Sequence, residues 1–297
     1  MEKGNGLKKN KRKFVFIMLA IPCIHWLVFW LYININSILF AFKLPAGGWS
    51  LNNFVMFWDS LTARGGEINI ALKNTLAYFL STVVVVIPFS IFIAYFIYKR
   101  IVAYKFFRII FYLPAIISTV ALVGVYKEFI QPWGPLVKII ESIGGKTPVK
   151  GFLGDYNTAT GAIVAYCIWT GFAGNMLLFS GAMSRIPLEI IEAEKIEGCG
   201  FFAELIHVIL PLIWPTISTV LIFTMTGIFT SSGPILLFTE GQFETMTISY
   251  WIFNNVYKVG GGSYNMVSCA GLCFTVAGVP IILFVRWLLD RFEAVEY

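Results

Sequence analysis

The sequence predicts an all-α integral membrane protein with six transmembrane helices. Hydrophobic residues make up 58% of the 297 residues and only 13% are charged, whereas a soluble domain is about 45–50% apolar. Six long stretches contain no Asp, Glu, Lys or Arg: 14–42, 74–98, 109–126, 156–184, 205–239 and 259–285. Each can hold a spanning helix, because only helices and closed barrels satisfy backbone polar groups inside a bilayer. The alternating pattern of barrel strands is absent.

These stretches place the boundaries of the elements. The expected helices cover about 14–41, 74–98, 107–129, 157–183, 206–231 and 264–289. Together they form a transmembrane domain of 14–290, with a basic tail of 1–13 before it, a polar loop of 184–205 within it and a tail of 291–297 after it. The charge-free run 245–257 is too short to span a bilayer, which leaves a re-entrant or an interfacial helix there.

The distribution of basic residues sets the orientation. With the N-terminus inside, fourteen of the 22 Lys and Arg residues fall in the N-terminal tail, in the loops 99–108 and 184–205, and at the C-terminal end, where Arg286 and Arg291 stand. The remaining eight are spread over three longer loops on the other side. Because Lys and Arg are enriched in cytoplasmic segments, both termini and the 184–205 loop are expected to be cytoplasmic.

The net charge of +6 does not indicate a nucleic-acid partner, because the basic residues stand mostly at the ends of apolar runs. Five cysteines lie in or beside apolar segments without the spacing of a metal site or disulfide framework. We therefore expect no metal, no cofactor and no nucleic acid bound to this chain.

The 184–205 loop gathers acids that the rest of the chain avoids. Five of the sixteen Asp and Glu residues fall between Glu189 and Glu204. Pro187 and the nearby acids favour a helix start, and Gly198 and Gly200 stop or bend that helix. Ile186, Ile190, Ala193 and Ile196 or Glu197 fall at helical spacing, giving a short apolar stripe beside the acids.

Two interpretations fit this short helix. A helix lying on the membrane surface normally carries Lys and Arg toward anionic lipid, and this one is acidic. The alternative, insertion into a groove on a partner protein, suits its charge and its hinge better.

The same residues resemble a known family. "EAEKIEG" followed after nine residues by "VILP" is similar to the EAA signature of the membrane subunits of ATP-binding-cassette importers. The matching residues are Glu192, Ala193, Gly198, Val208, Leu210 and Pro211. Glu194 stands where a small residue is usual, and Cys199 where alanine is common. The stretches "LKNTLAYF", "FFRIIFYLPAIIS" and "WTGFAGNMLLFSGAMSRIP" also resemble the carbohydrate-uptake branch, similar to maltose and glycerol-phosphate permeases.

The resemblance implies a type I importer permease fold in a bacterial cytoplasmic membrane. It further implies a homologous second permease as heterodimer partner, two cytoplasmic ATPase subunits that bind ATP and Mg, an extracellular solute-binding protein and a sugar substrate. Glu192, Ala193, Glu194, Gly198, Leu210 and Pro211 would couple this subunit to its ATPase. The chain lacks a phosphate-binding loop, because "GGKT" at 144–147 has Ile140 where the motif needs glycine.

A sugar calls for hydroxyls, amides and aromatic faces rather than charges. Candidate residues of the substrate pathway are Gly171, Asn175, Thr226, Thr230 and Ser231, the last two in a stretch where related permeases place polar lining residues. The alternative role for such small and hydroxylated residues is close helix packing.

The predicted function is therefore a permease subunit that moves a carbohydrate inward by alternating access, and not an enzyme. A second hypothesis is a stand-alone channel or secondary carrier for a neutral polar solute. The six charge-free stretches that form the centres of the spans contain no acidic or basic residue, which argues against an ion-coupled carrier. A membrane-embedded enzyme has little support, because the spans contain no nucleophile, metal or acid–base cluster.

Overall fold

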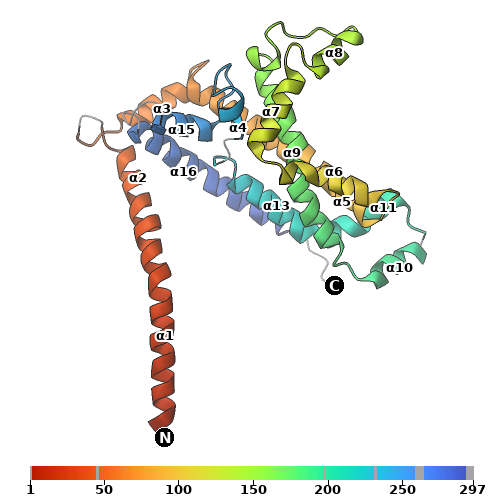
Figure 1. The fold of residues 1–297 in the computed structure, drawn as a ribbon. Helices are drawn as coiled ribbons and strands as arrows, with labels where there is room; N and C mark the ends of the chain where they lie inside the picture. Colours follow the sequence, from red (N-terminus) through yellow and green to blue (C-terminus); the bar gives the residue numbers. More distant parts are fainter. Residues whose placement is uncertain (1, 45–46, 197, 231–232, 258–263, 292–297) are drawn as a thin grey trace. The chain divides into compact units, whose positions relative to one another are not determined.

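The computed structural model describes residues 2–44, 47–196, 198–230, 233–257 and 264–291, and it is almost entirely helical (Figure 1). Within these ranges no β-strand forms, and the nearest approach is an isolated antiparallel bridge between Lys43 and Trp49. The chain divides into two compact units, one of Met1–Asp59 with Asn255–Thr275, the other of Ser60–Asn254 with Val276–Tyr297. The all-α prediction is confirmed.

Four helices in the described part are long and apolar enough to cross a membrane: Lys13–Ala41, Glu67–Tyr98, Ala159–Met183 and Tyr264–Leu289. Two bent pairs pass the same test together, Tyr104–Ile116 with Thr119–Ser142 and Phe201–Leu212 with Trp214–Thr226. Counting each bent pair as one span gives up to six, as the charge-free stretches predict.

The first unit begins with one long apolar helical run. It consists of α1 (Glu2–Trp26), a π-helical stretch η1 (Leu27–Tyr32) and α2 (Ile33–Ala41). The last turn of α2 is capped by α3 (Asn52–Thr62), because the Asn53 amide donates to the carbonyls of Ala41 at 2.9 Å and Lys43 at 2.8 Å. Asn265, at the start of α16 (Tyr264–Leu289), donates to the same Lys43 carbonyl. These amides satisfy carbonyls that a helix end leaves unpaired.

The second unit contains most of the helices. Besides the second half of α16, from Val276 on, they are α4 (Glu67–Ser81), η2 (Thr82–Val86), α5 (Ile87–Tyr98), α6 (Tyr104–Ile116), α7 (Thr119–Ile130), α8 (Pro135–Ser142), η3 (Phe152–Gly154), α9 (Ala159–Met183), α10 (Leu188–Ile196), α11 (Phe201–Glu204), η4 (Leu205–Ile209), α12 (Leu210–Leu212), α13 (Trp214–Thr226), α14 (Ile235–Phe238) and most of α15 (Ile248–Tyr257). The last of these shows that the charge-free run 245–257 is helical from Ile248 on; its relation to a membrane stays a prediction.

The second predicted span is a single helical run longer than expected. It starts at Glu67 rather than at residue 74 and continues through α4, η2 and α5 to Tyr98. Glu67 is stable in the first turn because an acidic side chain there complements the helix dipole. The middle of the run is π-helical at Thr82–Val86, just before Pro88, which cannot donate a backbone hydrogen bond.

The third predicted span, 107–129, is not one straight helix. The chain turns by 105° between Ile116 and Thr119. Pro114 lies in the last turn of α6, and Ser118 caps α7 by accepting a hydrogen bond from the Ala121 amide at 3.3 Å. A proline removes a helical hydrogen bond and a serine cap starts a new helix, so the two together explain the break.

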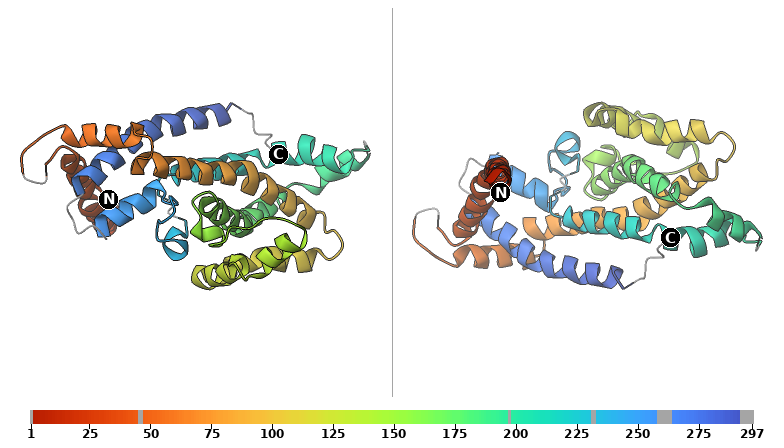
Figure 2. Two further views of the ribbon diagram at one scale, coloured as in Figure 1. Left: turned by 90° about the horizontal axis from the view of Figure 1, so that it is seen from above. Right: turned by 90° about the horizontal axis from the view of Figure 1, so that it is seen from below.

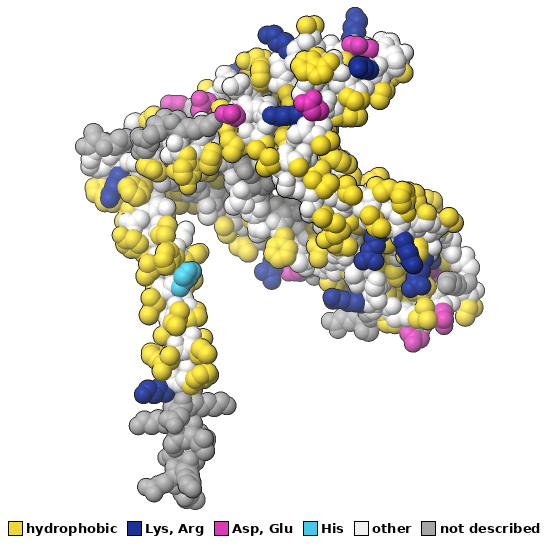
Figure 3. All heavy atoms as spheres, viewed as in Figure 1, with side chains coloured by type: hydrophobic (Ala, Val, Ile, Leu, Met, Phe, Trp, Pro, Cys, Tyr) yellow, Lys and Arg dark blue, Asp and Glu magenta, His cyan; other side chains and the backbone are white. Residues whose placement is uncertain are grey.

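The apolar core of the second unit lies where α5 packs along α9. The two helices lie side by side in the views from above and from below (Figure 2). Buried residues of α5, α9, α10 and the α11–α13 segment form one cluster that includes Ala94, Tyr95, Phe179, Ile191 and Ile209. Charged side chains gather at the two ends of this unit, near α8 and near α10, with apolar side chains between them (Figure 3). This distribution is the one expected of a membrane protein.

Candidate functional site

The short helix α10 presents an exposed face of mixed character. Leu188, Glu192 and Ile196 follow one another at four-residue intervals and therefore lie on one side of the helix. Leu188 is 64% exposed and Ile196 is 87% exposed, although both are apolar. Glu189 and Ala193, also exposed, extend this face. We call these five residues the α10 face.

The opposite side of α10 is anchored in the core. Ile191 is buried, and Ile190 packs against the same cluster as Ile186, which precedes the helix. The predicted apolar stripe is therefore divided: Ile186 and Ile190 turn inward, while Ala193 and Ile196 are exposed. The reason is that Ile190 and the buried Ile191 lie on the side of α10 that meets the core cluster, whereas Ala193 and Ile196 lie on the other side.

Gly198 ends α10 as predicted. Its φ is +75°, in the left-handed region that suits glycine. The Cys199 amide donates to the Glu194 carbonyl at 3.3 Å, which is the six-to-one hydrogen bond of a Schellman cap. The cap turns the chain toward α11 within a few residues.

Glu194 differs from the other acids of α10 because it is buried, at 8% exposed. Both of its carboxylate oxygens lack a hydrogen-bond partner among the described residues. Burying an unpaired polar group lowers stability, and more so when it is charged.

We therefore expect Glu194→Ala to raise the stability of the purified chain in detergent. The gain is about 1–3 kcal/mol, the usual cost of a buried polar group without a partner. Thermal unfolding monitored by circular dichroism measures it, with the exposed Glu192→Ala as the matched control on the same helix. A lower midpoint for Glu194→Ala than for the control would show that the carboxylate is paired in the folded protein.

After Gly200 the chain forms a second arm, α11, η4 and α12, which bends by 71° into α13. Leu210 packs against the core, and Pro211 stands in the first turn of α12 after the π-helical stretch. Pro211 and Pro215 withdraw backbone donors on both sides of the bend, which weakens the helix there. The Trp214 indole donates to the Leu289 carbonyl at 3.3 Å, tying the bend to the end of α16.

A cavity of about 270 Å³ lies deeper in the second unit. Its lining residues come from α4, η2, α9, α13 and the segments around Gly233 and Thr247: Thr75, Tyr78, Phe79, Thr82, Cys167, Thr224, Gly227, Ile228, Gly233 and Thr247. None of these lining residues is charged. A wider hollow of about 730 Å³ adjoins it, because Cys167 and Gly233 line both. We call the smaller space the threonine cavity.

Hydrogen bonds hold the walls of the threonine cavity in place. Thr75 donates to the Ala71 carbonyl at 2.7 Å and accepts from the Ile248 amide at 3.0 Å, which joins α4 to α15. Asn74 adds donors to the carbonyls of Glu244 at 2.6 Å and Met246 at 2.9 Å. The Tyr78 hydroxyl is buried and has no partner among the described residues. It is therefore a buried polar group without a partner in the described part of the chain, on a residue that lines the cavity.

Comparison with known proteins identifies the chain. Residues 86–294 match the family described as "Binding-protein-dependent transport system inner membrane component", which is more than half of the sequence. The chain belongs to this family. It is a membrane-embedded permease component of a transport system that depends on a binding protein, and not an enzyme.

Curated relatives align over most of their length. The permease is 26% identical to the multiple sugar-binding transport system permease protein MsmF of Streptococcus mutans over 93% of this chain and 94% of the relative. It is 24% identical to the lactose transport system permease protein LacF of Rhizobium radiobacter over 82% and 80%. It is 25% identical to the arabinooligosaccharides transport system permease protein AraP of Bacillus subtilis over 74% and 70%.

A solved structure shares the fold. A chain of a bacterial alginate ABC transporter, crystallised with a periplasmic protein bound to an alginate pentasaccharide, superposes with a TM-score of 0.81. The two chains are 23% identical over 98% of the permease and 99% of that chain. The predicted importer permease fold is thus confirmed.

The predicted coupling residues of the permease lie on α10, at its cap and in the arm that follows. Glu192 and Ala193 belong to the exposed α10 face, and Gly198 forms its cap. Glu194 faces inward, while Leu210 and Pro211 lie in the arm that follows. The fold thus brings these residues into one connected segment; their coupling role stays a prediction.

Of the predicted substrate-pathway residues, Gly171, Asn175, Thr226 and Thr230 are described, and none of them is among the lining residues of the threonine cavity. Thr226 and Thr230 are exposed, and each donates to the carbonyl three residues earlier in the chain, at 2.9 and 3.2 Å. Asn175 is half-buried in α9. Gly171 faces Val86, since a Cβ placed there would lie 3.1 Å from Val86 Cγ1. Ser231 lies outside the described residues.

The hydroxyls of α4 and η2 that line the cavity are absent from the sequence prediction. Thr75, Tyr78 and Thr82 are spaced by three and four residues in the charge-free stretch 74–98. This spacing puts them on one helix face, a signal that the sequence contains. Thr247 reaches the same cavity from a distant segment, which no local pattern indicates.

Proposed function

We propose that this permease is the membrane subunit of an ATP-driven importer that carries a sugar or oligosaccharide into a bacterial cytoplasm by alternating access. The observation that supports it most is the α10 face, which exposes apolar and acidic side chains outside the candidate spans while its other side is buried in the core. Exposed apolar side chains on a short charged helix favour docking in a groove of a partner.

The proposed partners follow from this face and from the family. Two ATPase subunits would take up the α10 segments of this permease and of a homologous second permease, and a solute-binding protein would deliver the sugar from outside. This arrangement puts both termini and α10 on the cytoplasmic side, as the excess of Lys and Arg in those segments favours. ATP and Mg would bind to the ATPase subunits.

A carbohydrate substrate is supported by the chemistry of the cavity and by the relatives. The threonine cavity offers hydroxyl groups and the aromatic rings of Tyr78 and Phe79 without a charged side chain. Hydroxyls and aromatic faces are the groups that recognise neutral polyhydroxylated ligands. The relatives described above are named for sugars, lactose and arabinooligosaccharides.

Purification and reconstitution test the proposal. The tagged chain is isolated from its native membrane with its bound proteins, and the complex is placed in liposomes with ATP and the binding protein. We expect an ATPase to copurify, and uptake of radiolabelled lactose or arabinooligosaccharides to require ATP. Uptake by the isolated chain without ATP would instead establish a channel or secondary carrier.

Substitutions in the threonine cavity test its role in transport. Tyr78→Phe and Thr82→Val each remove one hydroxyl, and we expect uptake to fall about three- to tenfold, the effect of one lost hydrogen bond. Sugar binding to the binding protein is measured in parallel and stays unchanged. Thr219→Val is the matched control, because Thr219 is exposed on α13 and donates to the Pro215 carbonyl at 2.7 Å. Equal uptake by all three variants would exclude the cavity from the pathway.

A further inference from the structure

One continuous helical run connects the threonine cavity to the region around α10. Thr75, Tyr78 and Thr82 line the cavity from α4 and the start of η2. Tyr95 lies in the last turn of α5, and Lys99 caps the same run. With a rise of 1.5 Å per residue, Thr82 and Tyr95 are separated by about 20 Å along the axis. A movement at the Lys99 end can therefore reach the cavity along one continuous helical run.

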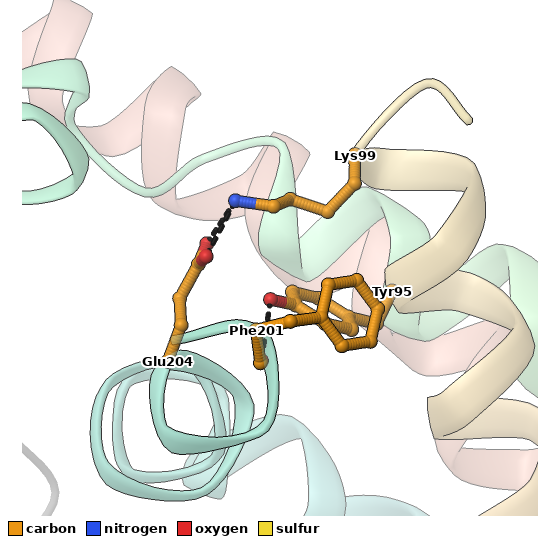
Figure 4. A network of polar contacts seen from close by, with 4 residues as sticks. All are labelled: Tyr95, Lys99, Phe201 and Glu204. Carbon is orange, nitrogen blue, oxygen red and sulfur yellow. Dashed lines mark hydrogen bonds and ion pairs between the residues drawn. The ribbon is translucent and has the colours of Figure 1, made fainter. Parts of the chain in front are cut away.

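Two polar contacts attach the end of this run to α11 (Figure 4). Lys99 Nζ lies 2.7 and 2.5 Å from the two carboxylate oxygens of Glu204. The Tyr95 hydroxyl donates to the Phe201 carbonyl at 3.0 Å. Both contacts join residues more than one hundred positions apart in the sequence.

Because these contacts are largely buried, breaking them lowers stability more than breaking an exposed pair does. The side chain of Glu204 is 6% exposed and that of Lys99 24%, and Tyr95 is fully buried. An exposed ion pair contributes little, but removing one partner of a buried pair leaves an uncompensated charge and is strongly unfavourable. The Lys99 ammonium also lies at the C-terminus of α5, where the helix dipole favours a cation.

Aromatic packing surrounds the polar contacts. The ring of Phe201 lies 4.7 Å from Tyr95 and 5.2 Å from Phe96, centroid to centroid. Phe202 stacks on Phe92 at 6.5 Å. These ring contacts hold α11 against α5 beside the ion pair, and α11 follows the cap at Gly198 within a few residues.

We propose that Lys99, Glu204, Tyr95 and the Phe201 carbonyl form a latch that makes α11 and the α4–η2–α5 run move as one body. A displacement imposed on α10 by the ATPase is then passed through α11 to α5, and along the same helical run to the wall of the threonine cavity. The four groups act as positioning residues that contact neither nucleotide nor sugar. This inference rests on the proposed function, because it describes how that coupling reaches the cavity.

The test compares sugar transported with ATP hydrolysed in the reconstituted complex. Lys99→Met and Glu204→Gln each break the ion pair, and we expect the sugar imported per ATP to fall about tenfold or more. Because both variants remove the same interaction, the double variant is expected to match the singles. Exchanging the charges, Lys99→Glu with Glu204→Lys, should restore the ratio to within about threefold of wild type.

Controls separate positioning from simple destabilisation. Lys105 is an exposed basic residue in the first turn of α6. Lys105→Met should therefore leave the sugar imported per ATP unchanged. ATPase copurification and unfolding temperature are recorded for each variant. A loss of stability alone would lower transport and hydrolysis together, whereas a broken latch leaves basal hydrolysis and removes its increase by the sugar-loaded binding protein.

If the variants of Lys99 and Glu204 fail to assemble, Tyr95→Phe serves instead, because it removes only the hydroxyl that donates to the Phe201 carbonyl. We expect it to lower the ratio several-fold with assembly intact. Unchanged ratios in Tyr95→Phe or in assembled Lys99→Met, within an importing wild-type background, overturn the latch alone. A wild-type complex that copurifies no ATPase and imports without ATP overturns the proposed function and the latch with it.

Discussion

Replacing Ile196 by Asp is expected to abolish binding of the ATPase and to lower ATP-dependent uptake at least about thirtyfold, the effect of losing an interface residue that contributes 2 kcal/mol or more. Ile196 is 87% exposed in this subunit, although its side chain is apolar. A partner groove that covers it removes apolar area from water, whereas an aspartate there would be a buried charge without a partner. Copurification of the ATPase with the tagged chain measures the first effect, and liposome uptake the second.

Val102→Asp is the matched control for that experiment. Val102 is an apolar residue in the loop between α5 and α6, and it is 92% exposed. It lies outside the α10 face, so the same change of chemistry should leave the ATPase bound. If Ile196→Asp retains the ATPase and transports normally, the α10 face is not the docking surface.

Replacing Gly171 by Leu is expected to destabilise the permease by about 1–3 kcal/mol, the cost of overpacking a filled interior site. A Cβ at Gly171 would approach Val86 Cγ1 to 3.1 Å and Cγ2 to 3.4 Å, and a leucine extends further into the same space. Val86 is buried at the end of η2, so α9 and the π-helical stretch would have to separate. The midpoint of thermal unfolding of the isolated chain in detergent measures the loss.

Gly174→Leu provides the control, because Gly174 is on the same helix, is exposed, and has no atom within 4 Å of an added Cβ. We expect its unfolding midpoint to match wild type. The comparison decides between the two roles considered for Gly171. A stable Gly171→Leu variant that fails to import sugar would support a place in the substrate pathway, and an unstable one supports close packing of α9 against η2.

Local patterns in the sequence were sufficient to predict where α10 starts and ends. Pro187, the acids around Glu192 and the pair Gly198 and Gly200 act through the backbone of their own neighbours, so the start and end of the helix could be predicted. Burial was harder. Ile190 and Ala193 have similar local patterns, yet one packs in the core and the other is exposed, because the orientation of a short helix depends on what lies beneath it.

The candidate cavity could be predicted only in part. Its stripe of Thr75, Tyr78 and Thr82 follows helical spacing, but Thr224 and Thr247 join it from segments far along the chain. Thr226, one of the predicted substrate-pathway residues, is adjacent in sequence to Gly227, which lines the cavity. The side chain of Thr226 itself is exposed and is not among the lining residues. A shift of one or two positions on a helix changes the direction of a side chain by about 100–200°.

The amino-acid sequence alone determined that this protein is helical and embedded in a membrane, and which segment between the spans is rich in acids. Those properties follow from hydropathy, charge and backbone preference, which act over a few residues. The tertiary structure alone decided that Lys99 meets Glu204, that Glu194 is buried, and that Thr247 joins the threonine cavity. Such features arise from packing between residues distant in the chain, where the partner of a side chain is set by the whole fold rather than by its neighbours.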